Sequence, residues 1–300
     1  MYQTPQISPL LKIRTRCIVS ELIITEDLLR MKSARFSMEI SFDGTAYSGW
    51  QSQSNSCAVQ DILEEKISLL FGMKVKTTGS SRTDSGVHAL GFAVSFDAPE
   101  KENLPPSRIK DALNSLLPPD IRINSVSYTE ASFHARYSAL AKAYTYVINT
   151  GDASPFDFKW TLRRSGCRNI DAIKEALPHI VGTHDFSAFT VKRSAIDNPV
   201  RTIYSADAQF LGKYLCITLV GNGFLYKMVR CIVGAMVEVG ENRLSPDAVK
   251  TILESLDRGE APATAPPHGL FLMKVFYEEG LHEKFHLEKL PFFYDLNQNQ

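Results

Sequence analysis

Alternating apolar and polar residues predict a series of short β-strands along this chain. Phe36, Met38, Ile40 and Phe42 are each separated by one polar residue, the period of two that a half-buried strand shows. Similar patterns predict further strands at 74–78, 92–96, 122–128, 133–137, 144–149, 203–210, 214–220 and 270–277. Gly212 lies between two of these strands and indicates a hairpin turn.

Helical spacing of apolar residues predicts helices between these strands. The clearest covers 59–71, with an apolar face and an acidic opposite face. Further helices are expected after Pro105-Pro106, after a cap at Asp171, over 226–239 and after Ser245-Pro246. Strands and helices in this order predict an α+β fold. We expect two similar halves, each with a mostly antiparallel sheet flanked by helices, and a cleft between them.

These patterns also divide the chain. We expect an N-terminal extension over 1–34, an N-terminal domain over 35–138, a C-terminal domain over 139–280 and a tail over 281–300, with frayed last residues. Strand patterning begins just after Met31. The first thirty residues are therefore expected either to lack regular structure or to precede the true start at Met31.

Composition narrows the class of protein. The 300 residues include 33 Lys+Arg and 33 Asp+Glu, so the formal net charge is zero, and 44% are hydrophobic. Such a balance fits a soluble globular protein and argues against binding of nucleic acid by bulk charge alone. No apolar run is long enough to span a bilayer. The five cysteines are scattered, which favours free thiols in a reducing cytoplasm over a disulfide framework.

The stretch 79–89, Gly-Ser-Ser-Arg-Thr-Asp-Ser-Gly-Val-His-Ala, carries the candidate chemistry. Its small polar residues favour a turn between two strands. Within it, Arg82 lies two residues before Asp84, and a cation beside a carboxylate favours the ionised form that a nucleophile needs. The Arg82–Asp84 pair could equally have a purely structural role and stabilise the turn. His88 could act as a general base or could hydrogen-bond the loop backbone.

Other chemistries have weaker support. A glycosidase needs a second carboxylate facing the same bond, and nothing indicates that Asp43 or Asp97 converges with Asp84. The histidines and cysteines show no metal-ligand spacing apart from His282 and His286 in the tail, which are expected at the surface. Six basic residues and several aromatics alternate between residues 136 and 168, a mixture that suits phosphate contacts and base stacking but also an ordinary solvated surface.

Five motifs follow one another along the chain. They are Tyr-x-Gly-Trp-Gln at 47–51, Arg-Thr-Asp-x-Gly-Val-His-Ala at 82–89, Phe-His-Ala-Arg at 133–136 with Lys-x-Tyr-x-Tyr at 142–146, Phe-x-Tyr-x-Met-Val-Arg at 224–230, and Thr-Ala-Pro at 264–266 followed by Gly-Leu at 269–270. In this order they resemble the motifs of the TruA-type tRNA pseudouridine synthases, and the stretch at 82–89 resembles the catalytic signature of that family. They cover roughly residues 36–277.

The resemblance implies a ferredoxin-like fold in each half and the isomerisation of uridine to pseudouridine without cofactor or metal. It implies Asp84 as nucleophile, Arg82 to orient it and help displace the base, Tyr144 against the flipped uracil, and Arg230 paired with Asp84. Arg136 and His88 are expected as further substrate contacts. The implied target is the tRNA anticodon stem-loop at the uridines that the family numbers 38, 39 and 40, bound by a homodimer.

Two other functions remain open: a catalytically silent tRNA-binding protein of the same fold, and a nucleoside hydrolase that uses Asp84. The chain also departs from the family. Ser81 and Ser85 stand where glycine and alanine are expected, and a serine adopts positive φ less readily than glycine. Lys142-Ala143 replaces a more basic pair before Tyr144.

Overall fold

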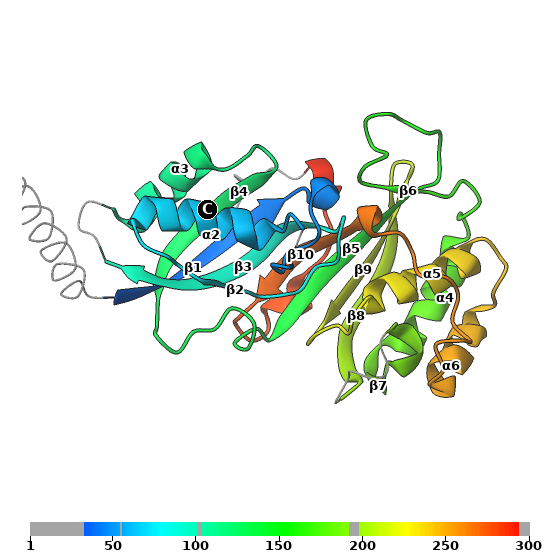
Figure 1. Ribbon diagram of the computed structural model, residues 1–300. Coiled ribbons are helices and arrows are strands. Elements are labelled where there is room, and N and C mark those ends of the chain that lie inside the picture. Colours follow the sequence, from blue (N-terminus) through cyan, green and yellow to red (C-terminus); the bar gives the residue numbers. More distant parts are fainter. Residues whose placement is uncertain (1–32, 55, 101–103, 192–197, 294–300) are drawn as a thin grey trace, which may run out of the picture.

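A computed structural model describes residues 33–54, 56–100, 104–191 and 198–293, and its strands form a single sheet (Figure 1). The order is β4-β1-β3-β10-β5-β9-β8-β7, with β2 paired to β3 and β6 to β5. The strands are β1 Ser33–Phe42, β2 Thr77–Gly79, β3 His88–Pro99, β4 Ile121–Thr129, β5 Ala141–Asn149, β6 Leu162–Arg163, β7 Gly182–Asp185, β8 Val200–Leu211, β9 Tyr214–Gly221 and β10 Leu270–Phe276. Nearly all of the predicted extension lies outside the described residues.

The two expected halves meet in the middle of this sheet. β10 pairs in parallel with β3 through Phe271 and His88, and on its other side it pairs antiparallel with β5. Apart from this joint and the short β5–β6 pair, the strand pairs are antiparallel, as predicted. The α+β class is confirmed, and the last strand of the chain joins the two halves.

The helices cover one face of the sheet. Figure 1 shows α2 and α3 over one half and α4, α5 and α6 over the other. Their apolar stripes and the facing side chains of the strands form one large core. The α-helices are α2 Val59–Phe71, α3 Pro106–Leu116, α4 Ile170–Ala176, α5 Met228–Gly240 and α6 Pro246–Ser255, and 3₁₀ turns occupy Gly44–Ala46, Leu177–Ile180, Ser187–Phe189, Pro267–Gly269, Leu281–Lys284 and Pro291–Phe293.

The opposite face of the central strands is covered by the C-terminal segment. Leu287 and Leu290 are buried there against Ala143, Val147 and neighbouring apolar side chains of β5 and β10. Side chains of a strand alternate between faces, so β5 contributes its tyrosines to one core and its small residues to the other. The predicted tail is therefore packed on the sheet as far as Phe292, and residues 294–300 lie outside the described part.

Three local predictions are wrong. Residues 133–137 form a loop instead of a strand, because tertiary hydrogen bonds to neighbouring elements fix this segment. The strand expected at 74–78 is the shorter β2, Thr77–Gly79. The cap of α4 is Asn169, whose side chain accepts a hydrogen bond from the Ala172 amide, while Asp171 lies in the first turn.

Candidate active site

The loop between β2 and β3 presents Asp84 at the boundary between the two halves. A neighbouring segment braces this loop: the Ser85 hydroxyl and the Gly86 amide both donate to the Tyr47 carbonyl, at 3.1 and 3.3 Å. Gly49 has a φ of +94°, and a Cβ there would collide with the Thr83 carbonyl. Only glycine permits so close an approach of the two segments. The motifs at 47–51 and 82–89 therefore pack directly against each other.

Asp84 forms an ion pair with Arg230 of α5. The Arg230 Nη1 atom lies 2.7 Å from Asp84 Oδ2, and the two side chains are only 10% and 15% exposed. The guanidinium is held from a second side, because its Nε donates to the Ala265 carbonyl at 2.8 Å. A charge-assisted hydrogen bond of this kind orients the carboxylate. The structure therefore brings together two residues that the sequence motifs separate widely.

Arg82 occupies a different place from the one expected. Its side chain is exposed, and the ion pairs among the described residues include none between Arg82 and Asp84. It instead forms an exposed part of the lining of the same cleft. The cation that fixes the carboxylate is therefore Arg230, and the role of Arg82 in orienting Asp84 lacks a contact in this structure.

Tyr144 of β5 lies in the wall of the cleft. Its ring is 8% exposed and meets Phe224 edge to face, with centroids 5.2 Å apart. Burial raises the pKa of its hydroxyl to about 12, and this group donates to Ser81 Oγ at 3.3 Å. Ser81 and Ser85 both keep negative φ, so the replacement of the expected residues leaves the turn intact. The serine at 81 adds a hydrogen-bond partner for the tyrosine.

The remaining two predicted residues have different positions. Arg136 is exposed and lines the cleft, as a substrate contact would. His88 is buried beneath the loop and is absent from the cleft lining. Its ring stacks on Phe271, its Nδ1 lies 3.0 Å from both the Gly44 amide and the Asp43 carboxylate, and its Nε2 faces the His268 carbonyl at 3.1 Å. His88 is thus held in a structural position, although its partners are Asp43, Gly44 and His268 instead of the backbone of the 79–89 loop.

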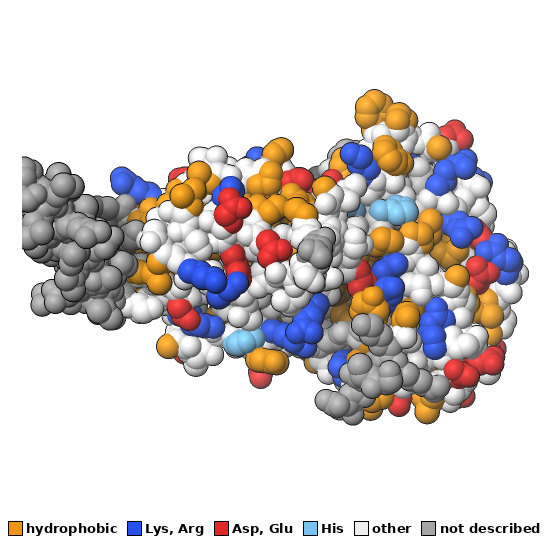
Figure 2. Space-filling model, in the orientation of Figure 1, with side chains coloured by type: hydrophobic (Ala, Val, Ile, Leu, Met, Phe, Trp, Pro, Cys, Tyr) orange, Lys and Arg blue, Asp and Glu red, His pale blue; other side chains and the backbone are white. Residues whose placement is uncertain are grey.

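The cleft has a volume of about 690 Å³ and a strongly cationic lining. Among the described residues, Asp84 is the single acidic one in the lining, whereas the basic ones are Arg82, Arg136, Lys142, Arg201, Lys227 and Arg230. In Figure 2, lysine and arginine side chains gather where the two halves meet. Burial, together with Arg136 and Arg201, lowers the pKa of Lys142 to about 8. A protein of zero net charge thus concentrates positive charge around one carboxylate.

Two of these cations escaped the sequence analysis. Arg201 is the second residue of β8, and burial lowers the pKa of its guanidinium. Lys227 lies inside the 224–230 motif and caps α5 with a φ of +59°, an uncommon conformation for a residue with a side chain. Strained backbone at a cleft is a recognised sign of function. In the sequence, Lys227 was marked only by its place inside that motif, at a position to which the motif assigns no particular residue type.

Within the described ranges, no group of three or more histidine, cysteine or acidic side chains is arranged to hold a metal ion. No helix among the same residues is long and apolar enough to cross a membrane.

Comparisons with known proteins define the class to which this fold and site belong. The family model described as "tRNA pseudouridine synthase" matches residues 38–138 and 176–278. A relative from Exiguobacterium sibiricum, named tRNA pseudouridine synthase A, is 42% identical over 82% of this chain and 98% of its own length. The protein of that name from Bacillus subtilis is 40% identical over 81% of this chain and 99% of its own.

The chain therefore belongs to the tRNA pseudouridine synthase family, and the resemblance seen in its motifs is confirmed. Its class as an isomerase of uridine in tRNA follows from this membership. Among solved structures, a Cbf5-Nop10-Gar1 complex aligns with 79% of this chain and 58% of its own, at 10% identity and a TM-score of 0.32. That likeness is too slight to add to the assignment.

Proposed function

We propose that this protein converts uridine to pseudouridine in the anticodon stem-loop of tRNA, at the positions numbered 38, 39 and 40, with Asp84 as the nucleophile. The observation that carries the proposal is the ion pair of Asp84 with Arg230 in the lining of a basic cleft. A carboxylate that an ion pair orients and that is only 15% exposed has the geometry required for covalent catalysis.

In the proposed reaction, the Asp84 carboxylate bonds to C1′ of the ribose while the N1–C1′ glycosidic bond breaks. The detached uracil turns within the cleft, and its C5 bonds to C1′, which displaces the carboxylate. C5 then gives up its proton and N1 takes up one, so the product is an isomer of the substrate and no external reactant is consumed. Tyr144 and Phe224 provide an aromatic wall against which the uracil can turn.

The target uridine must leave its stack to reach Asp84, which costs a few kcal/mol. Arg82, an exposed part of the cleft lining, is placed to fill the space that the base vacates. The surrounding cations, among them Arg136 and Lys142, suit contacts with the RNA backbone. Backbone contacts carry no base preference, so they support a single site that serves three neighbouring uridines.

The direct test is to incubate the protein with unmodified tRNA and map pseudouridine by chemical sequencing. The wild type is expected to modify the anticodon arm, whereas Asp84→Asn binds the same RNA without forming product. Modification that survives in Asp84→Asn contradicts the assignment of the nucleophile. Released uracil would indicate a hydrolase, and binding without product in the wild type would indicate a silent tRNA-binding protein.

We also propose a cytoplasmic homodimer, in which two clefts share one tRNA. The absence of disulfides among the described cysteines, one of which is exposed, is compatible with a reducing compartment. Light scattering on the purified protein tests the dimer. A mass of one chain at micromolar concentration would contradict it.

A further inference from the structure

A second, smaller hollow adjoins the catalytic cleft. Its volume is about 220 Å³, and it shares Ser81, Arg82 and Arg136 with the cleft. We name it the Gln51–Tyr137 hollow, after two residues of its lining, which also includes Trp50, Gln60, Arg82 and Arg136. Sites for free small molecules generally exceed about 300 Å³. This hollow suits one group of a larger ligand that the neighbouring cleft already holds.

Tyr137 offers an exposed aromatic ring on a loop that is fixed in place. The side chain is 77% exposed, yet its own amide and that of Arg136 both donate to His134 Nδ1 at 3.1 Å. The His134 ring packs against that of Tyr137, with centroids 4.3 Å apart. The loop is held in place by Ala135 as well, whose amide donates to Ser95 Oγ and whose carbonyl accepts from the Tyr277 hydroxyl. A ring held in this way loses little entropy when a base stacks on it.

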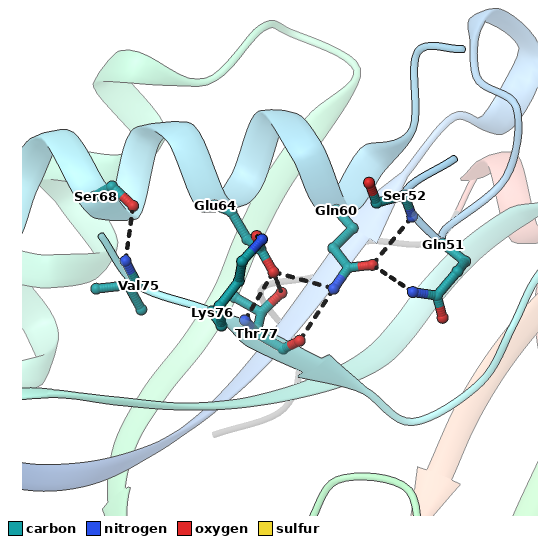
Figure 3. A network of polar contacts seen from close by, with 8 residues as sticks. All are labelled: Gln51, Ser52, Gln60, Glu64, Ser68, Val75, Lys76 and Thr77. Carbon is teal, nitrogen blue, oxygen red and sulfur yellow. Dashed lines mark hydrogen bonds and ion pairs between the residues drawn. The ribbon is translucent and has the colours of Figure 1, made fainter. Parts of the chain in front are cut away.

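The hydrogen bonds of Gln60 fix Gln51, which also lines the hollow (Figure 3). Gln60 Oε1 accepts from Gln51 Nε2 at 3.0 Å and from the Ser52 amide, and Gln60 Nε2 donates to Glu64 Oε1 and to the Thr77 carbonyl. The Gln60 amide is therefore saturated.

Gln51 retains one acceptor and one donor. Its Oε1 atom has no hydrogen bond in the described part of the chain, and in Figure 3 it points away from Gln60. Nε2 uses one of its two hydrogens on Gln60, so the other is available. An adjacent donor and acceptor on one planar amide match the pattern on the edge of a nucleobase.

The charges at the rim of the hollow favour a polyanion. The Arg82 and Arg136 side chains form no ion pair with any described residue. The Arg136 guanidinium instead lies 5.5 Å from the centroid of the Tyr137 ring. Aromatic rings combined with unpaired guanidinium groups are typical of sites that bind single-stranded nucleic acid.

We propose that the Gln51–Tyr137 hollow binds a second nucleobase of the same RNA, one displaced from the stem when the target uridine enters the catalytic cleft. The base stacks on Tyr137, its edge meets the Gln51 amide, and Arg82 lies between the two displaced bases. Capture of the second base offsets part of the stacking and pairing energy lost when the uridine leaves. This inference rests on the proposed function, because it takes RNA as the substrate.

The test uses full-length protein and a tRNA anticodon stem-loop that carries 2-aminopurine, a fluorescent base, either beside or opposite the target uridine. Binding is measured in the Asp84→Asn background, so that no turnover occurs, and pseudouridine formation is measured separately with intact Asp84. We expect a fluorescence change at one of these positions. Tyr137→Ala should abolish it and weaken binding roughly 5-fold or more, and Gln51→Ala should weaken binding less.

Two control variants make the result specific. Tyr137→Phe keeps the ring and should bind as tightly as the parent protein. Tyr204→Ala removes an exposed tyrosine of β8 that lines neither the cleft nor the hollow, and it should leave the fluorescence change intact. Unchanged binding and unchanged fluorescence in Tyr137→Ala would overturn the inference, as would an equal loss in Tyr204→Ala.

The outcomes also separate this inference from the proposed function. If the wild type forms no pseudouridine but Tyr137→Ala still loses the fluorescence change, the proposed function is refuted and the binding of a second base in the hollow is supported. If the wild type forms pseudouridine and Tyr137→Ala matches it in both kcat and KM, the binding of a second base is refuted and the proposed function is supported.

Discussion

The ion pair between Arg230 and Asp84 leads to a prediction that can be worked from its geometry. The Nη1–Oδ2 distance is 2.7 Å and both side chains are nearly buried. Two unit charges about 4 Å apart interact by about 4 kcal/mol at an effective dielectric constant near 20. Removing one partner leaves the other charge without its counterion in a site poor in water. We therefore expect Arg230→Met and Asp84→Asn each to lower the free energy of unfolding by about 3 kcal/mol.

The double variant shows whether Arg230 and Asp84 stabilise the protein as a pair or independently of each other. In Arg230→Met with Asp84→Asn neither charge remains, so the penalty of an unpaired charge disappears. The loss in the double variant should be smaller than the sum of the single losses by about 2 kcal/mol. Urea denaturation of all four proteins gives this coupling energy directly. Arg230→Met should in addition abolish most pseudouridine formation, since Asp84 would lose its orientation.

Arg35 and Asp97 provide a matched control. Their Nη1–Oδ2 distance is also 2.7 Å, and Arg35 likewise donates from Nε to a backbone carbonyl. Asp97, however, is 57% exposed, so solvent screens the pair and its coupling energy should stay below about 1 kcal/mol. Equal coupling in the two pairs, or strict additivity at Arg230 and Asp84, would refute the reasoning from burial.

Three further predictions concern the surroundings of the site. Burial lowers the pKa of Lys142 to about 8, so its charge is present below pH 8 and lost above it. The affinity for tRNA should therefore fall between pH 7 and pH 9. Lys142→Gln should remove this pH dependence, whereas Lys142→Arg should keep the affinity high over the whole range. The Thr83 hydroxyl is buried without a hydrogen-bond partner in the described structure. Thr83→Val should therefore leave the free energy of unfolding unchanged or raise it by up to about 1 kcal/mol, and a decrease of more than about 1 kcal/mol would show that the hydroxyl has a partner. A Cβ at Gly44 would collide with the Val87 carbonyl, so Gly44→Ala should cost about 1–3 kcal/mol and shift the loop of Asp84, while Gly223→Ala, which has room, should change thermal unfolding little.

Much of the secondary structure followed from local patterns. The helix expected at 59–71 is α2 with the same bounds, and the hairpin expected at Gly212 joins β8 and β9 with a φ of +62°. These elements depend on spacing and turn chemistry that lie within a dozen residues. The strand predicted at 133–137 is wrong because the alternation of apolar and polar residues there reflects contacts with β3 and Tyr277 instead of pairing with another strand.

The sequence by itself determined the family and pointed to Asp84, because the motifs that carry them are short and local. Proximity along the chain alone suggested Arg82 as the partner of Asp84, whereas the resemblance to the family implied Arg230. The tertiary structure shows which of the two makes the contact: Arg230 is 146 residues away and meets Asp84 because β10 joins the two halves in one sheet. Which cation lies beside a carboxylate depends on how the sheet and α5 pack, and no local pattern records that packing.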